Sequence, residues 1–124
     1  MKAVSILALC AAAVAAAADS TYDPKYDSFN IDEVAGNPRL LRNYGNCFLD
    51  KGPCTAEGSV FKGLIDEALR TDCGKCTPVQ RKSIRTAVRA FRKDLPELWE
   101  EIVKKYDAKG EYRASFQKFL EASD

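Results

Sequence analysis

The sequence predicts an all-α fold, a single domain of about six short amphipathic helices. Three observations support this prediction. Apolar residues recur at three- and four-residue spacing along most of the chain after Phe29, as they do on one face of a helix. No segment alternates apolar and polar residues for long enough to indicate a strand. Several segments begin with a capping residue or with a proline in the first turn, which is typical of helix starts.

The first segment of the chain differs from the rest. Met1 and Lys2 precede an unbroken run of apolar or small residues over 3–18, which ends in alanines before Asp19. A positive start, an apolar core and a small-residue cleavage site are typical of a secretory signal peptide. A membrane anchor is the alternative, but the run is shorter than the ~20 residues that a bilayer span needs. We therefore expect residues 1–18 to be a signal peptide and residues 19–124 to form a secreted, extracellular domain without stable membrane anchoring.

The balance of charges and the absence of histidine limit the kinds of function that the protein can have. The chain has 19 Lys and Arg against 18 Asp and Glu, and it has no histidine. Loss of Lys2 with the signal peptide would leave no net charge, which argues against nucleic acid as a partner. Histidine is the commonest general base and the commonest metal ligand. Mechanisms that pair serine or cysteine with histidine are therefore excluded, and we assign no catalytic residue, cofactor or metal ion.

The first elements after the signal peptide are an arm and two helices. Residues 19–29 have no clear period and are expected to be extended. Asn30 is placed to cap a short helix, with Glu33 reaching back as in a capping box. Asn37-Pro38 ends that helix and starts the next, because proline disfavours helical geometry before it yet fits a first turn. The apolar positions of the second helix are Leu40, Leu41, Tyr44, Cys47 and Phe48.

Two longer helices are expected in the middle of the chain. Gly52-Pro53 is expected to stop the preceding helix, and Thr55 is placed to cap the next one. Its apolar positions are Val60, Phe61, Leu64, Ile65, Ala68 and Leu69. Thr77-Pro78-Val79-Gln80 combines a cap, a proline and a glutamine three residues after the cap, which predicts a second helix start. The apolar face of that helix holds Ile84, Ala87, Val88 and Phe91.

The last two helices are indicated by the same signals. Asp94-Leu95-Pro96-Glu97 is interpreted as a further helix start. The apolar positions that follow are Leu98, Trp99, Ile102, Val103 and Tyr106. Gly110 is expected to end this helix. A final helix is marked by Tyr112, Phe116, Phe119 and Leu120.

The cysteines indicate disulfides. Cys10 would leave with the signal peptide, and Cys47, Cys54, Cys73 and Cys76 remain. An even number in an exported chain indicates disulfide bonds. Three pairings are open and the sequence alone does not choose, although close spacing favours neighbouring cysteines. A redox-active Cys-x2-Cys pair and a four-thiolate zinc site are weaker alternatives, since the chain lacks a βαβ pattern and its first pair is widely spaced.

Two further patterns admit a functional and a purely structural interpretation. Basic residues gather on one helix, opposite its apolar face: Arg81, Lys82, Arg85, Arg89, Arg92 and Lys93. Such a face can meet an acidic partner or anionic headgroups, but we favour a plain solvent face. The chain is also rich in aromatics at helical positions. These normally form a core, but they could also surround a cavity for a long-chain ligand.

The cysteine spacing Cys47-x6-Cys54-x18-Cys73-x2-Cys76 resembles that of the insect chemosensory proteins, the four-cysteine OS-D or pheromone-binding A10-like family. The resemblance covers residues 22–116. The matching words are Lys25-Tyr26-Asp27, Ile31-Asp32-Glu33, Arg39-Leu40-Leu41, Asn43-Tyr44, Leu49 to Thr55, Glu57-Gly58, Lys75-Cys76-Thr77, Gln80, Pro96, Trp99 and Lys105-Tyr106-Asp107.

The resemblance implies six helices around an apolar channel, disulfides Cys47–Cys54 and Cys73–Cys76, and no catalysis. It implies a monomer that reversibly binds fatty-acid-like, odorant or pheromone-type molecules. The expected ligand-binding residues are Tyr26, Tyr44, Phe48, Phe61, Ile65, Ile84, Val88, Trp99, Tyr112 and Phe116. The alternative is a secreted interaction or developmental factor that acts through the basic helix face.

The chain departs from the family pattern at a few positions. Asp66 stands where many relatives have a proline, so the helix that Thr55 caps is expected to run on. Val34-Ala35-Gly36 replaces a bulkier segment of the family sequence, and this change predicts a short first helix. Phe116 stands where a tyrosine is common, so a hydroxyl is lost. These departures bear on the shape of the ligand site.

Overall fold

The computed structural model describes residues 21–124, so the predicted signal peptide lies outside the described residues. This part of the chain forms one 3-10 turn and six α-helices, and the all-α prediction is confirmed. In chain order the elements are η1 (Pro24–Ser28), α2 (Ile31–Ala35), α3 (Pro38–Phe48), α4 (Ala56–Arg70), α5 (Pro78–Asp94), α6 (Pro96–Tyr106) and α7 (Arg113–Glu121). Over residues 21–124, no helix is long and apolar enough to cross a membrane.

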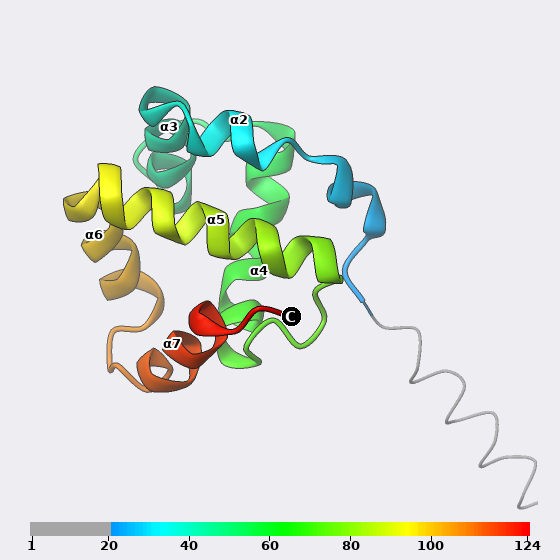
Figure 1. Ribbon diagram of the computed structural model, residues 1–124. Helices are drawn as coiled ribbons and strands as arrows, with labels where there is room; N and C mark the ends of the chain where they lie inside the picture. Colours follow the sequence, from blue (N-terminus) through cyan, green and yellow to red (C-terminus); the bar gives the residue numbers. More distant parts are fainter. Residues whose placement is uncertain (1–20) are drawn as a thin grey trace, which may run out of the picture.

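Helix α5 organises the molecule. It runs across the front of the fold, with α2 and α3 above it, α4 behind it, and α6 and α7 below (Figure 1). The close helix pairs are α5 with α2, α3 and α6, and α3 with α2, α4 and α6. Helix α7 belongs to none of these pairs. It is therefore joined to the rest of the fold mainly through its side chains.

The predicted helix starts are largely present. The side chains of Asn30, Asn37 and Thr55 each accept a hydrogen bond from an amide in the first turn of the helix that follows. At Asn30 the Glu33 carboxylate accepts from the Asn30 side-chain amide at 3.5 Å and not from the Asn30 backbone amide, so only half of the expected capping box exists. At Thr77 both bonds of the box are present. These starts depend on neighbouring residues, and for that reason the sequence could predict them.

The structure differs from the predicted elements in three places. The residues expected to form an extended arm contain η1, because Pro24 fits a helical first turn and the Asp23 side chain accepts from the Lys25 amide. Helix α3 ends at Phe48, before the expected stop at Gly52-Pro53, and Asp50 turns the chain with φ 61°. Helix α6 starts at Pro96 as expected, but Leu95 holds its cap position and no side chain caps it.

Two local disulfides fix the ends of α4. Cys47 in α3 is bonded to Cys54, with their Cα atoms 5.0 Å apart. Cys73 is bonded to Cys76 in the loop between α4 and α5, with a Cα separation of 5.1 Å. Cys47 and Cys73 are each only 1% exposed. The cysteines are thus paired with their neighbours, and α4 is held at both ends although, among the helices of residues 21–124, it forms a close pair with α3 alone.

The apolar core has two parts. The larger cluster contains Val34, Leu41, Ala90, Phe91, Leu95, Leu98 and Ile102, from α2, α3, α5 and α6. The smaller one contains Cys73, Val88, Phe119 and Leu120, and it joins α7 to α5 and to the second disulfide. Ile84, Trp99 and Phe116 are only half-buried against this smaller cluster.

The prediction that the basic side of α5 faces solvent is wrong for two of its arginines. Arg85 is 3% exposed and lies in the core, and Arg81 is half-buried. Both are covered because the chain after α7 returns over this side of α5, which helical periodicity alone cannot reveal. The remaining basic residues of the face, Lys82, Arg89, Arg92 and Lys93, are exposed. The basic surface is therefore smaller than expected.

Candidate functional site

A cavity of about 660 Å³ lies between the helices. Residues from η1 and from all six α-helices line it, and most of them are apolar. Its volume falls within the range of about 300–1,000 Å³ that is usual for small-molecule sites. The cavity exists because the half-buried aromatic and aliphatic side chains of the helices do not close fully on one another.

The cavity brings together almost all of the residues predicted to contact a ligand. Its wall includes Tyr26, Tyr44, Phe48, Phe61, Ile65, Ile84, Val88, Trp99 and Phe116. Tyr112 is outside the wall, so the structure does not bring it together with the other predicted residues. Tyr112 precedes the first turn of α7, at the cap position, and its amide donates a hydrogen bond to Asp107 Oδ1 at 3.3 Å. It therefore does not share the apolar face of the helix with Phe116.

The sequence missed several wall residues. Tyr22 and Phe29, on either side of η1, line the cavity, but the arm that holds them has no periodicity that could have indicated this. Leu41 and Ile102 face it from α3 and α6, and they were expected only as helix core. Tyr106 also lines the cavity. It is an aromatic residue at an apolar helix position, and this signal could have added it to the predicted ligand-binding residues.

Aromatic rings form one end of the cavity. Phe61 of α4 makes edge contacts with Tyr26 at 5.6 Å and with Phe29 at 5.0 Å between ring centroids. Phe29 in turn meets Tyr44 of α3 at 5.8 Å. Such edge-to-face contacts are favourable beyond the burial of apolar area. The N-terminal arm is thus packed against α3 and α4 through its rings and closes this end of the cavity.

The tyrosine hydroxyls in the wall are largely engaged with the protein. Tyr22 Oη donates to Glu67 Oε1 at 2.9 Å, and Tyr106 Oη donates to the carbonyl of Phe48 at 2.7 Å. Burial, followed by the hydrogen bond to Glu67, raises the pKa of Tyr22 to about 12. Because these polar atoms already have partners, the interior presents mainly carbon to anything that enters it.

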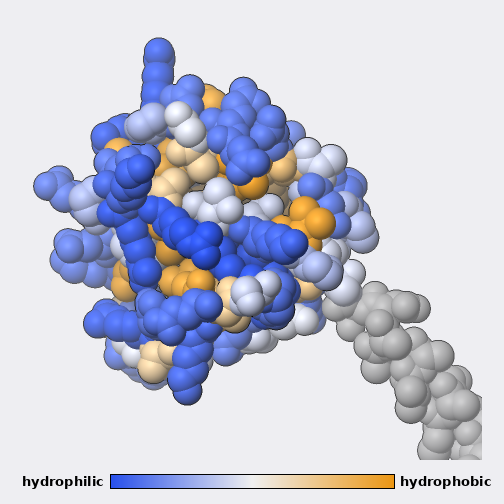
Figure 2. All heavy atoms as spheres, in the orientation of Figure 1, coloured by the Kyte–Doolittle hydropathy of each residue, from blue (hydrophilic) through white to orange (hydrophobic). Residues whose placement is uncertain are grey.

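The cavity reaches the surface between α5, α6 and α7. Exposed charged residues from these helices belong to its wall: Arg92, Glu100, Lys104 and Arg113. Arg92 donates to Gln117 Oε1 at 3.0 Å and its guanidinium lies 5.9 Å from the centre of the Trp99 ring. Figure 2 shows that the face carrying α5 is mostly hydrophilic, with small apolar patches between the charged side chains.

The chemistry that this arrangement supports is the sequestration of an apolar molecule. The wall offers apolar contact area and few free polar groups. The cysteines that could have formed a zinc site are consumed in disulfides. In the part of the chain that the structure describes, no group of three or more His, Cys, Asp or Glu side chains is placed to hold a metal ion.

Sequence comparison finds close relatives among insect proteins. Allergen Tha p 1 of Thaumetopoea pityocampa is 39% identical over 122 residues, which cover 98% of this chain and 97% of the relative. Ejaculatory bulb-specific protein 3 of Drosophila melanogaster is 36% identical over 110 residues, covering 89% of this chain and 87% of the relative. Putative odorant-binding protein A10 of Drosophila melanogaster is 37% identical over 99 residues, covering 80% of this chain and 64% of the relative.

Solved structures share the fold. A chemosensory protein in complex with bromo-dodecanol matches with a TM-score of 0.72 and 36% identity, over 79% of this chain and 98% of that one. Antennal chemosensory protein A6 of the moth Mamestra brassicae matches with a TM-score of 0.64 and 35% identity, over 80% and 92% of the two chains. Residues 22–114 match the family model described as insect pheromone-binding family, A10/OS-D. The chain therefore belongs to this family of insect chemosensory proteins, as the cysteine spacing and its flanking words predict.

Proposed function

We propose that this protein is a secreted, soluble carrier that reversibly binds fatty-acid-like, odorant or pheromone-type molecules in its internal cavity. The observation that carries the proposal is the apolar cavity of about 660 Å³ to which every helix contributes. A bound chain would contact the aromatic end near Phe61 and extend toward Trp99 and Phe116. We take it to act as a monomer, and it needs no catalysis, because a carrier works by equilibrium binding alone.

The relatives support this proposal. One solved relative has bromo-dodecanol bound, and another relative is named as a putative odorant-binding protein. Both descriptions concern molecules with long apolar or volatile character, which matches the carbon-lined wall of this cavity. The signal peptide predicted over residues 1–18 supports a location outside the cell.

The driving force is the removal of apolar surface from water. Each methylene buried by the cavity contributes about 0.8 kcal/mol. Release cannot depend on imidazole protonation, because the chain has no histidine. Release instead follows from the equilibrium itself, or from movement of a part of the wall.

Trp99 provides a direct test, because it is the chain's single tryptophan and lines the cavity. A brominated long-chain alcohol should quench Trp99 emission in a saturable manner, since a bromine atom quenches an indole that it touches. The unbrominated alcohol should compete with it without quenching. Displacement of a fluorescent apolar probe, N-phenyl-1-naphthylamine, should give the same order of affinities. No saturable quenching, together with no displacement by long-chain acids, alcohols or esters, would overturn the proposal.

A matched pair of variants locates the binding in the cavity. Ala87 lines the cavity and is half-buried, whereas Ala56 is exposed at the start of α4 and outside the wall. Ala87→Phe should weaken probe binding at least about tenfold, because a ring placed in the wall takes the space of several methylenes worth about 0.8 kcal/mol each. Ala56→Phe should bind as the parent protein does. Equal loss in both variants would place binding elsewhere.

A further inference from the structure

Helix α7 is the side of the cavity with the least backbone packing. It contributes Arg113, Phe116 and Gln117 to the wall, but it forms no close pair with another helix. Its buried side chains, Phe119 and Leu120, belong to the smaller core cluster. The position of this wall therefore depends on a small number of side-chain contacts.

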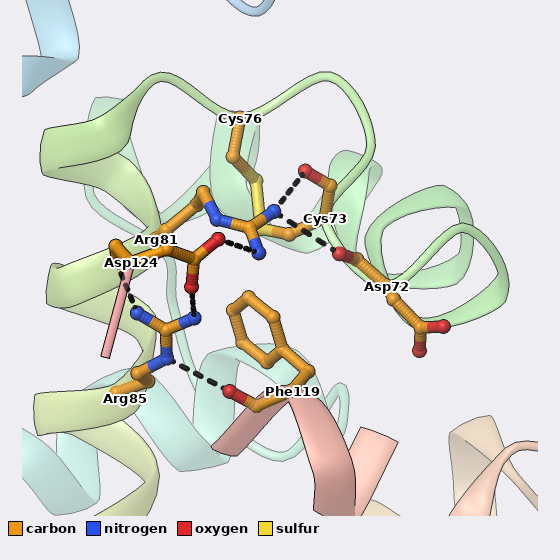
Figure 3. A network of polar contacts seen from close by, with 7 residues as sticks. All are labelled: Asp72, Cys73, Cys76, Arg81, Arg85, Phe119 and Asp124. Atoms are coloured by element: carbon orange, nitrogen blue, oxygen red, sulfur yellow. Dashed lines mark hydrogen bonds and ion pairs between the residues drawn. A yellow bond between two sulfur atoms is a disulfide. The ribbon is translucent and has the colours of Figure 1, made fainter. Parts of the chain in front are cut away.

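The strongest of these contacts lie where the chain returns over α5 after α7. Arg85 Nε donates to the carbonyl of Phe119 at 2.8 Å, and its two other nitrogens donate to the Asp124 carbonyl at 2.6 Å and to Asp124 Oδ1 at 2.5 Å. Arg81 Nη2 meets Asp124 Oδ2 at 2.6 Å. Figure 3 shows the Asp124 carboxylate held between the two guanidinium groups.

Arg81 extends the network to the second disulfide. Its Nη1 donates to the carbonyls of Asp72 at 3.4 Å and Cys73 at 3.2 Å, as Figure 3 shows. Asp72 and Cys73 have φ of 52° and 62°, a left-handed backbone conformation that residues other than glycine rarely adopt. The arginine thus binds carbonyl groups that a disulfide-closed loop presents to it. The tail after α7 is tied to the rigid loop between α4 and α5.

The network is connected to the cavity through stacked rings. The guanidinium groups of Arg81 and Arg85 lie 5.0 Å and 4.5 Å from the centre of the Phe119 ring, within cation–π distance. Phe119 stacks on Phe116 at 5.4 Å, and Phe116 is part of the cavity wall. A displacement of the tail would therefore move Phe119, and with it Phe116.

We propose that residues 122–124 are a latch that holds α7 closed against the cavity, and that opening of the latch at Asp124 sets the rates of ligand entry and release. The inference rests on the carrier function proposed above. Arg81 and Arg85 act as positioning residues: they touch no ligand, but they fix the wall that does. The bound ligand gains its affinity elsewhere, in the apolar interior.

The latch can open because Arg85 and Asp124, its two charged partners, differ in solvent exposure. Arg85 is buried, with its side chain 4% exposed, whereas the side chain of Asp124 is 59% exposed. Water and salt can therefore compete for the carboxylate without first opening the core. A cation as buried as Arg85 is costly to leave unpaired, so the closed state is preferred and the open state is transient.

The experiment compares Asp124→Asn with Glu111→Gln. Both variants remove one exposed carboxylate near an end of α7, but Glu111 is not part of the latch. In Asp124→Asn, the stopped-flow association and dissociation rates of N-phenyl-1-naphthylamine should both rise about tenfold, the effect of losing a charge-assisted hydrogen bond. The dissociation constant should stay within about twofold of the parent value, because the cavity interior is unchanged. Glu111→Gln should show the parent rates.

Amide hydrogen exchange provides a readout that does not require ligand. In Asp124→Asn, exchange in α7 should accelerate while exchange in α3 and α6 stays at the parent level. Parent-like exchange in α7 would overturn the latch. Faster exchange with unchanged probe rates would overturn its control of ligand entry. If the parent protein takes up no probe, the carrier function fails, and the exchange result still decides whether the latch exists.

Discussion

Gly45 lies where α3 packs against α5 and α6, and there is no room at this position for a side chain. A Cβ built at Gly45 would be 2.5 Å from Leu98 Cδ2 and 3.0 Å from Phe91 Cε1. We expect Gly45→Ala to lower the free energy of unfolding by about 1–3 kcal/mol, the usual cost of overpacking a core. Denaturant unfolding measures this change.

Gly63 is the matched control for this substitution. It also lies within a helix, but apart from its chain neighbours and the backbone of its own helix, nothing comes within 4 Å of a Cβ built there. Gly63→Ala should raise the free energy of unfolding by about 0.5–1 kcal/mol, because alanine has less backbone freedom to lose. If Gly45→Ala is as stable as Gly63→Ala, then α3 does not approach Phe91 and Leu98 closely enough to exclude a methyl group.

Tyr22 makes stability depend on alkaline pH. Burial and the hydrogen bond to Glu67 raise its pKa from 10.0 to about 12, so the folded protein favours the neutral hydroxyl. This contribution to stability is fully present below pH 10 and is lost as pH rises through the folded value of about 12. The free energy of unfolding should therefore fall between these two pH values, and less steeply in Tyr22→Phe.

A second variant identifies the cause of the shift. Glu67→Gln keeps an acceptor for the Tyr22 hydroxyl but removes the nearby negative charge that helps to raise its pKa. As pH rises, the free energy of unfolding of this variant should fall by an amount between those of the parent and Tyr22→Phe. Denaturant unfolding at a series of pH values measures this fall. Identical pH profiles for the parent and Tyr22→Phe would contradict the pKa assigned to this hydroxyl.

At the scale of elements, Thr77 joins the start of α5 to the arm that closes the cavity. Its hydroxyl accepts from the Gln80 amide at 3.1 Å and donates to Asp27 Oδ1 of η1 at 2.7 Å. Loss of an N-cap costs about 0.5–2 kcal/mol, and Thr77→Ala also leaves a half-buried carboxylate without its donor. We expect Thr77→Ala to cost about 1–3 kcal/mol, and Thr77→Ser to keep most of the stability.

Thr55 provides a comparison without a bond to the arm. It caps α4 in the same way, accepting from the Gly58 amide at 2.9 Å, but it is exposed and its hydroxyl donates only a long bond of 3.4 Å to Tyr44 Oη of α3. Thr55→Ala should therefore cost less than Thr77→Ala in the same unfolding measurement. An equal or larger cost at Thr55 would show that the bond to Asp27 contributes nothing.

The elements also show which features a sequence can predict. Helix starts at Asn37, Thr55 and Thr77 depend on residues within one turn, so their signals are local. The predicted end of α3 was wrong because the real end depends on distant residues. Asp50 turns the chain there and pairs with Lys62 of α4 and Lys105 of α6. The turn η1 was missed although Asp23 and Pro24, which form its start, are local signals, because the arm has no apolar period that indicates a helix.

The same distinction applies to the site. Ile84 and Trp99 could be assigned to the cavity because they lie on apolar helix faces and match family positions. Arg85 could not be recognised as buried, because it lies on the polar side of α5 and is covered only by the chain after α7. Tyr112 was placed in the site because it matches a C-terminal aromatic of the family, and it lies at the cap position before the first turn of α7. The burial of Arg85 depends on tertiary contacts, which the sequence pattern does not contain.

At the scale of the whole molecule, the size of the cavity should set the preferred length of the ligand. Along a series of straight-chain alcohols, each added methylene should tighten binding about fourfold, the equivalent of about 0.8 kcal/mol. The gain should stop when the chain fills the cavity of about 660 Å³ and the next carbon lies in water. Ala87→Phe, which shortens the available space, should move this plateau to a shorter chain, while Ala56→Phe should not move it. Competition with the apolar probe measures each affinity, and an affinity that does not depend on chain length would show that the ligand binds on the surface rather than between the helices.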